Sequence, residues 1–145
     1  MSDTIRTRTA PAPVGAYPHA RRVGELLFVS GIGPRRPDSD QIPGNVYADD
    51  GRLVSYDIEA QCRSVFENVR AVLEASGARF EDLVDVTVYL TDMARDFAAY
   101  NRVYAEYFTD AQPCRTTLGI TALPTPIAIE LKCVAAPGSA GGKRA

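Results

Sequence analysis

An arginine and a glutamate near the C-terminus of the sequence have the types and spacing needed for acid–base chemistry on a carboxylate substrate. Arg115 lies in an apolar and β-branched run over residues 113–120, and Glu130 lies within a second such run over residues 127–134. An arginine fork grips a carboxylate with two parallel hydrogen bonds, and a glutamate in mid-strand is a potential general base. We therefore expect an anion clamp and a base on neighbouring strands. The alternative is a cross-strand ion pair or two solvated charges.

The strand predicted over residues 127–134 has two chemically distinct faces. By the period of two, Ile129 and Leu131 share an apolar face, whereas Glu130 and Lys132 share the opposite face. Prolines in the preceding segment separate this strand from the first one. Glu130 is therefore expected to be a carboxylate in the middle of a strand.

Two further strands and a long loop are expected in the N-terminal third of the chain. Residues 14–23 form a candidate edge strand, and a turn at residues 24–25 leads into a strand over residues 26–30. The run over residues 26–30 is apolar on both faces, which predicts burial on both sides. Residues 33–51 are rich in proline, glycine and aspartate, as is typical of an irregular loop, and long ordered loops are often functional.

Two amphipathic helices are predicted from the spacing of apolar residues. The first begins after Asp57, a good N-cap, and ends at Gly77. Residues 83–90 then alternate as a strand that faces a core on one side. The second helix begins at about Asp96 and is rich in aromatic residues, which we interpret as packing against the sheet.

The order of these elements predicts one α+β domain. It runs hairpin, loop, helix, strand, helix, strand, strand, so both helices can cover one face of a single sheet. Residues 14–136 form this domain, residues 1–13 are predicted to be a flexible arm, and residues 137–145 a disordered tail. Two helices cannot cover both faces of the sheet. Another copy of the chain is therefore expected to cover the remainder in a closed-symmetry homo-oligomer.

Composition argues against several classes of function. The 145 residues include 16 Lys and Arg against 18 Asp and Glu, so the net charge is −2 and neither nucleic acid nor an anionic membrane is expected as a partner. No apolar run has the length of a membrane span and no signal peptide is recognisable, which predicts a cytoplasmic protein. The three cysteines and the single histidine, His19, do not form a metal-ligand pattern, and no nucleotide-binding motif is present. No metal or organic cofactor is therefore expected.

Several short motifs follow one another in a specific order along the chain. They are Gly15-Ala16-Tyr17, Leu27-Phe28-Val29-Ser30-Gly31, Asn68, Val86-Thr87-Val88-Tyr89-Leu90, Tyr100-Asn101, Tyr107-Phe108, Arg115-Thr116-Thr117, Leu123-Pro124 and Ile127-Ala128-Ile129-Glu130. In this order and spacing, the chain resembles the RidA/YjgF family of reactive-intermediate deaminases over about residues 10–135. The resemblance implies a chorismate-mutase-like fold, a homotrimer with active sites in clefts between subunits, and no cofactor.

The resemblance also implies roles for individual residues. Arg115 matches the arginine that holds the α-carboxylate of the substrate, and Glu130 matches the glutamate that positions a water. Thr117 lies where many members carry a cysteine whose backbone contacts substrate or water, so any role of Thr117 comes from its main chain. Tyr17 and Ser30 match positions that line the cleft.

A narrower resemblance concerns the basic residues of the N-terminal half. Tyr17-Pro18-His19, Arg35-Arg36-Pro37-Asp38 and Arg115-Thr116-Thr117 look like the 2-aminomuconate deaminase branch of the family. That substrate has a carboxylate at each end, and a single clamp would leave the distal one unpaired and desolvated, which is costly. His19, Arg22, Arg35 or Arg36 could bind it. The alternatives are a solvated loop for the arginine pair and a structural hydrogen bond for His19.

The expected function is therefore cofactor-independent hydrolytic deamination. The expected reaction converts 2-aminomuconate to 4-oxalocrotonate and ammonia during degradation of aromatic compounds. Arg115 orients the adjacent carboxylate, and Glu130 takes a proton from the attacking water. Two alternatives stay open: a general 2-aminoacrylate-type enamine/imine deaminase, and a non-catalytic trimer that binds small carboxylates.

Overall fold

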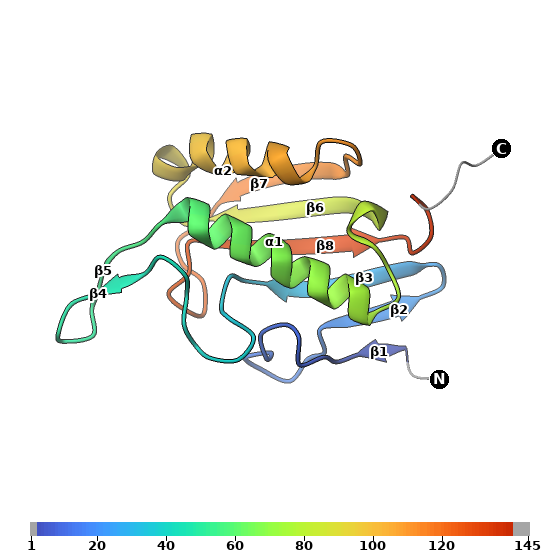
Figure 1. The fold of residues 1–145 in the computed structure, drawn as a ribbon, viewed down its shortest axis with the longest axis horizontal. Coiled ribbons are helices and arrows are strands. Elements are labelled where there is room, and N and C mark those ends of the chain that lie inside the picture. The colour runs from blue at the N-terminus through green and yellow to red at the C-terminus, as the bar shows by residue number, and fades with distance from the viewer. Residues whose placement is uncertain (1–2, 141–145) are drawn as a thin grey trace.

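One mixed sheet, with helices on a single face, makes up most of the chain. A computed structural model describes residues 3–140. In chain order its elements are β1 (Thr4–Ile5), β2 (Ala20–Val23), β3 (Leu26–Ile32), β4 (Val46–Tyr47), β5 (Leu53–Ser55), α1 (Ile58–Ala75), a short 3-10 helix (Phe80–Asp82), β6 (Leu83–Leu90), α2 (Met93–Tyr107), β7 (Cys114–Gly119) and β8 (Ile129–Ala135). Six strands pair in the order β1-β2-β3-β8-β6-β7, and β4 pairs with β5. Helices α1 and α2 cover one face of the sheet (Figure 1), which confirms the predicted α+β architecture.

Helix α1 begins and ends at the residues that the sequence predicts. The side chain of Asp57 accepts hydrogen bonds from the backbone N–H groups of Glu59 and Ala60, and Gly77 follows the helix with a φ of 77°. The apolar face of α1 packs onto the sheet through a row of fully buried side chains: Cys62, Val65, Phe66, Val69, Val72 and Leu73. No helix among residues 3–140 is long and apolar enough to cross a membrane.

Helix α2 begins before the position expected from the sequence. Asp92 is its N-cap and accepts a hydrogen bond from the backbone N–H of Arg95 at 3.1 Å. Asp96, the expected start, instead lies buried in the first turn, where its carboxylate accepts a hydrogen bond of 2.5 Å from the Tyr56 hydroxyl. The predicted start is wrong because two aspartates one turn apart are both good caps, and tertiary contacts decide between them.

The strands that carry Arg115 and Glu130 are not neighbours, contrary to the sequence prediction. Strand β7, with Arg115, pairs in parallel with β6, whereas β8, with Glu130, pairs antiparallel with both β3 and β6. The crossover through α2 makes β6 and β7 a parallel pair at the edge, and β8 then returns between β3 and β6. Strand β6 therefore separates the two residues.

The flexible arm expected for residues 1–13 is tied to the sheet over its described part. Thr4 and Ile5 form β1 and pair with Arg21 and Ala20 of β2, and Ala10 is buried in the core. Residues 1–2 lie outside the described residues. The expected tail, residues 137–145, is described only as far as residue 140.

The predicted hairpin between residues 14 and 30 is confirmed at its turn and corrected at its start. Val23 pairs with Leu26 across the turn, where Gly24 has a φ of 60° that favours glycine. Strand β2 begins only at Ala20, because Pro18 cannot donate to the sheet and residues 14–19 form an irregular segment.

The predicted irregular loop over residues 33–51 contains the first strand of a second hairpin. Strands β4 and β5 pair with each other and extend away from the main sheet (Figure 1). Three apolar side chains on this hairpin, Val46, Tyr47 and Val54, are exposed.

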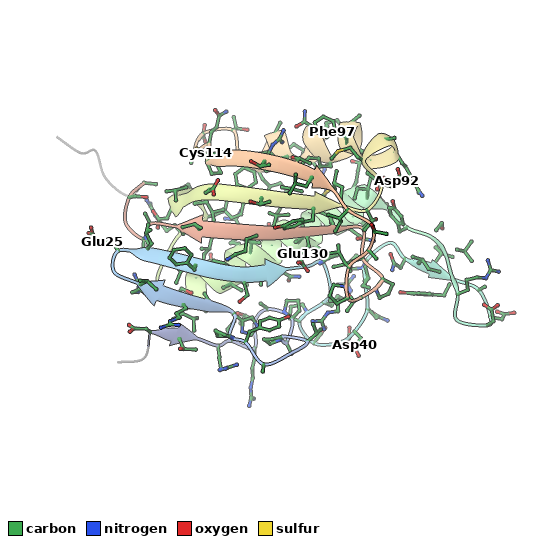
Figure 2. The ribbon with its side chains drawn as sticks, turned by 180° about the vertical axis from the view of Figure 1, so that it is seen from behind. Glu25, Asp40, Asp92, Phe97, Cys114 and Glu130 are labelled. Atoms are coloured by element: carbon green, nitrogen blue, oxygen red, sulfur yellow. The ribbon has the colours of Figure 1, made fainter. Side chains whose placement is uncertain are left out.

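The face of the sheet opposite the helices is open to solvent in the single chain. Figure 2 views the molecule from this side, with Glu130 in front of the sheet. Phe28 and Leu118 are 40% and 44% exposed, although the residues that flank Phe28 in β3, Leu27 and Val29, are fully buried on the helix side. The prediction that β3 is buried on both sides is therefore wrong for the single chain, because its apolar outer face is uncovered.

Candidate active site

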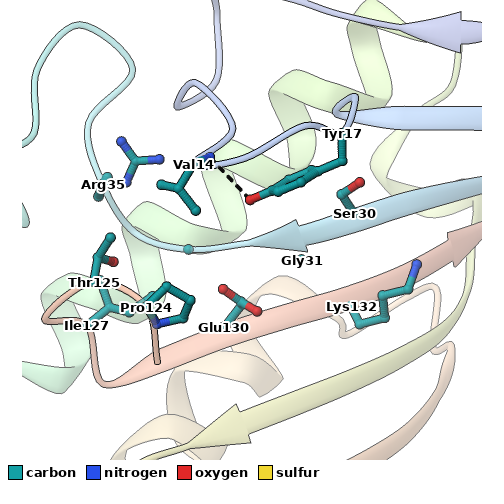
Figure 3. A pocket seen from close by; sticks show the side chains of 11 residues that line it. Val14, Tyr17, Ser30, Gly31, Arg35, Pro124, Thr125, Ile127, Glu130 and Lys132 are labelled. Atoms are coloured by element: carbon teal, nitrogen blue, oxygen red, sulfur yellow. Dashed lines mark hydrogen bonds between the residues drawn. The ribbon is translucent and has the colours of Figure 1, made fainter. Parts of the chain in front are cut away.

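A pocket of about 410 Å³ opens on the helix-free side of the sheet (Figure 3). Strands β3 and β8 form its floor, and three irregular segments form its walls: residues 14–17, residues 33–35 and residues 124–127. This volume is in the range of small-molecule sites. The lining residues are Val14, Tyr17, Ser30, Gly31, Gly33, Arg35, Pro124, Thr125, Ile127, Glu130 and Lys132.

Glu130 is the acidic side chain of this pocket. Its neighbours in β8, Ile129 and Leu131, are fully buried toward the helices, so alternation directs Glu130 to the opposite side. Burial raises the pKa of the Glu130 carboxyl group. Among residues 3–140, Glu130 has no hydrogen-bond or ion-pair partner. A carboxyl group with a raised pKa and no partner suits transfer of a proton to or from a bound molecule.

Gly31 provides the space that the Glu130 carboxyl group occupies. A Cβ atom on Gly31 would lie 2.6 Å from Glu130 Oε2 and 3.0 Å from its Cδ, closer than van der Waals contact allows. The absence of a side chain at residue 31 therefore lets β3 and the carboxylate of β8 sit side by side.

Lys132 is a basic lining residue that was not among the predicted site residues. Its Nζ donates a hydrogen bond of 2.6 Å to the carbonyl of Val29 and lies 6.0 Å from the centre of the Phe28 ring. The signal for its position was present in the sequence, because Lys132 shares a face with Glu130 by the alternation of the strand. Lys132 adds positive charge on the same side of the sheet.

Tyr17 and Ser30, both predicted to line the cleft, do line this pocket. The Tyr17 hydroxyl oxygen accepts a hydrogen bond of 3.2 Å from the backbone N–H of Val14, and the Ser30 hydroxyl donates one of 2.7 Å to the carbonyl of Pro18. The Ser30 bond therefore ties the irregular segment before β2 to the sheet, and the Tyr17 bond lies within that segment.

The two predicted loop arginines point to different places. Arg35 lines the pocket with only 16% of its side chain exposed, and its Nη2 donates a hydrogen bond of 2.6 Å to the carbonyl of Ala12. Its Nη1 contacts the fully exposed carboxylate of Asp40 at 3.5 Å. Arg36 is exposed and lines a separate depression beside the β4–β5 hairpin.

His19 lies behind the pocket wall and is buried. Its Nδ1 accepts a hydrogen bond from the backbone N–H of Thr7 at 3.3 Å, so its Nε2 carries the proton and donates to the carbonyl of Pro11 at 2.8 Å. Both ring nitrogens are thus engaged with the N-terminal segment. Arg22 is also directed elsewhere, because its Nη2 donates to the carbonyl of Ser76.

Arg115 and Thr117 lie on the helix side of β7, away from the pocket of the same chain. Arg115 is level with Val86 of β6, which is buried toward the helices, and its Nη1 donates a hydrogen bond of 2.8 Å to the Asn101 side chain in α2. The Thr117 hydroxyl shares a hydrogen bond of 2.9 Å with that of Tyr100. The chain therefore does not bring Arg115 and Glu130 together.

Aromatic rings of α2 support the Arg115 guanidinium group. Its Cζ lies 4.6 Å from the ring centre of Tyr104 and 5.3 Å from that of Tyr100. Cation–π contacts and the hydrogen bond to Asn101 hold the guanidinium group at the sheet edge. Asn101 was among the motif residues but not among the predicted site residues.

Comparison with known proteins places this chain in a family. A family model described as Endoribonuclease L-PSP matches residues 7–137. The chain belongs to this family, the RidA/YjgF family. Family membership confirms the broader of the two resemblances, that to the RidA/YjgF family.

Relatives in the RidA family span nearly the whole chain. A RutC family protein of Pyrococcus horikoshii is 40% identical over 135 residues, which cover 93% of this chain and 98% of the relative. The 2-iminobutanoate/2-iminopropanoate deaminase of Escherichia coli K12 is 33% identical over 138 residues, with coverage of 93% and 98%. The crystal structure of RidA from a Psychrobacter species matches with a TM-score of 0.79 and 32% identity, over 92% of this chain and 98% of that chain. Imine deaminase activity is thus supported at the level of the RidA family.

Proposed function

We propose that this protein is a cofactor-independent hydrolytic deaminase of enamine and imine acids. The observation that carries the proposal is the Glu130 carboxyl group, which has a raised pKa, no partner among the described residues, and a place in a pocket with Arg35 and Lys132. The name of the E. coli relative, an iminobutanoate and iminopropanoate deaminase, supports the same reaction class.

In the proposed reaction, Glu130 transfers the protons of one water molecule. The enamine first tautomerises to an imine, whose carbon is the electrophile. Water attacks this carbon while Glu130 accepts one of its protons and passes that proton to the imine nitrogen, so the resulting carbinolamine has both a hydroxyl and an amino group on one carbon. Glu130 then takes the hydroxyl proton and delivers it to the amino nitrogen, the C–N bond breaks, ammonia leaves, and a 2-oxo acid remains. A carboxyl group with a raised pKa suits both steps because it is neither a very weak base nor a very weak acid.

The α-carboxylate is held by Arg115 of a second copy in this proposal. Arg115 cannot share a pocket with Glu130 of its own chain, because the sheet lies between them. A homotrimer that covers the open face would bring the β7 edge of one copy to the pocket of the next. The exposed apolar residues Phe28 and Leu118 on that face favour such a contact, because soluble proteins seldom leave large apolar patches uncovered.

We further propose 2-aminomuconate as the substrate, with 4-oxalocrotonate and ammonia as products. Its second carboxylate needs a cationic partner within the pocket, and Arg35 supports this assignment. The ion pair between Arg35 and Asp40 is long, at 3.5 Å, and the Asp40 side chain is fully exposed. A substrate carboxylate can therefore replace Asp40 as the partner of Arg35 at little cost in free energy. His19 is a weaker candidate, because both of its ring nitrogens are already engaged.

The direct test is ammonia release from freshly generated 2-aminomuconate and from 2-aminoacrylate made in situ, with Glu130→Gln as the matched variant. General acid–base catalysis contributes about 10²–10⁴-fold, so Glu130→Gln should lose that much kcat while KM changes little. Faster release from the small enamine would favour a general imine deaminase. Carboxylate binding without release from either substrate would favour the non-catalytic alternative.

A further inference from the structure

Helix α1 carries polar side chains on the side that faces the pocket walls. Gln61, Ser64 and Asn68 are spaced by three and four residues, which places them on one side of the helix. Gln61 is fully buried and Asn68 is 4% exposed. Burying an amide is costly unless its hydrogen bonds are made, so the partners of these residues are informative.

The partners of Asn68 and Ser64 are consecutive carbonyl groups of one pocket wall. The Asn68 Nδ2 donates to the carbonyls of Gly33 at 2.9 Å and Arg35 at 2.8 Å. The Ser64 hydroxyl donates to the carbonyl between them, that of Pro34, at 2.7 Å. Both donors of the Asn68 amide are thus used to hold the main chain on either side of Pro34.

The hydrogen bonds from Asn68 and Ser64 reach the carbonyls of residues 33–35 and do not extend to Arg36. The carbonyl of the next residue, Arg36, accepts a 3.5 Å contact from Ser39 N within the loop, and the Arg36 side chain is exposed. Arg35, by contrast, has its main chain held by Asn68 and its guanidinium group held by Ala12 O beside the pocket. Asn68 therefore holds the main chain of Arg35, whereas the main chain of Arg36 bonds within its own loop, to Ser39 and Gln41.

We infer that Asn68 is a positioning residue for substrate specificity, which holds Arg35 where its guanidinium group binds the distal carboxylate of a dicarboxylate substrate. Asn68 acts through the backbone of residues 33–35 and not by contact with Glu130. The inference rests on the proposed function, because it assumes that a small carboxylate occupies this pocket.

The test compares two probes that differ only in the distal carboxylate. trans,trans-Muconate and sorbate share a six-carbon diene chain, and sorbate lacks the second carboxylate. Their dissociation constants are measured by calorimetry for the wild-type protein, Arg35→Met, Asn68→Ala and the double variant. Removing a hydrogen bond to a charged group costs roughly tenfold or more in affinity, so each single variant should lose most of a muconate preference of about that size. The double variant should lose no more than Arg35→Met alone.

Two further variants separate positioning from folding. Val72→Ala shortens a fully buried apolar side chain of α1 that makes no hydrogen bond to residues 33–35, so it should lower Tm and leave the muconate-to-sorbate ratio unchanged. Asn68→Ser keeps a polar group in the buried position but is too short to span both carbonyls, and should lose the preference as Asn68→Ala does.

A folded Asn68 variant that keeps the wild-type ratio would overturn the inference, as would wild-type protein that binds both probes equally. Failure of the proposed function looks different. Coupled effects of Asn68 and Arg35 on muconate binding, without ammonia release from 2-aminomuconate, would remove the reaction and retain the positioning role.

Discussion

Arg115 and Glu130 lie on opposite faces of the same sheet, with strand β6 between the strands that carry them. Arg115 contacts Asn101, Tyr100 and Tyr104 on the helix side, whereas Glu130 lines the pocket on the open side. A site that uses both residues must therefore take them from different copies of the chain. The proposed reaction therefore requires an assembly of at least two copies of the chain, because a single copy cannot supply both residues to one pocket.

The raised pKa of Glu130 predicts a specific pH dependence of activity. The general base must be ionised, so the acid limb of kcat/KM should lie above the pH near 4.3 at which a free glutamate titrates. The measurement is a pH profile of ammonia release, corrected for uncatalysed hydrolysis. An acid limb at the pH of an unperturbed glutamate would contradict this assignment.

The same pKa predicts the sign of a stability effect. Burial raises the folded-state pKa, so Glu130 favours folding below its unfolded pKa, and that contribution is lost as the pH rises through the folded pKa. Glutamine cannot ionise. Glu130→Gln should therefore raise Tm relative to wild type more at pH 8 than at pH 4, as measured by thermal melts at both values. A Tm difference that does not change with pH would show that the carboxyl group is not desolvated.

Gly31→Ala should inactivate the enzyme without unfolding it. The new Cβ would lie 2.6 Å from Glu130 Oε2, and the flexible end of the glutamate can move away at little cost to stability. A displacement of about 1 Å costs roughly 10²-fold in rate. Gly119→Ala is the matched control, because a Cβ there meets Met93 at an ordinary 3.5 Å. Equal kcat values for Gly31→Ala and Gly119→Ala would show that the space left by Gly31 does not set the position of Glu130.

Arg35→Ala and Arg36→Ala form an adjacent pair with opposite expectations. Arg35 lines the pocket and is mostly buried, so its loss should raise KM for 2-aminomuconate about tenfold and leave KM for 2-aminoacrylate nearly unchanged. Arg36 is exposed in a separate depression, and its loss should change neither constant. Steady-state kinetics with both substrates decides. Equal effects of the two variants would show that only the net charge of the loop matters.

Local chemistry made much of the fold predictable. The cap at Asp57, the stop at Gly77, the turn at residues 24–25 and the alternation around Glu130 depend on neighbouring residues, and the structure has each of them. The start of α2 was not predictable in this way, because Asp92 and Asp96 have equal local claims and the contact with Tyr56 comes from elsewhere in the chain.

The site was less predictable, because strand order is a long-range property. Alternation identifies the face of Glu130 within β8, but it does not say that β6 lies between β8 and β7. The different placement of Arg35 and Arg36 was not predictable either. The main chain of Arg35 is held by Asn68, which is distant in sequence and donates hydrogen bonds to the carbonyls of Gly33 and Arg35. The embedding of residues 4–10 in the fold depends on β2 and His19.

The most direct test of a site shared between copies is complementation between two inactive variants. Arg115→Ala and Glu130→Gln are each inactive in the proposed mechanism. In mixed trimers formed by co-expression, a site regains both residues when one copy supplies the arginine and the next the glutamate, so about one quarter of sites should be active. Ammonia release from 2-aminomuconate at about that fraction of the wild-type rate is the predicted result. Mixed oligomers that stay as inactive as either variant alone would contradict a site built from Arg115 of one copy and Glu130 of another.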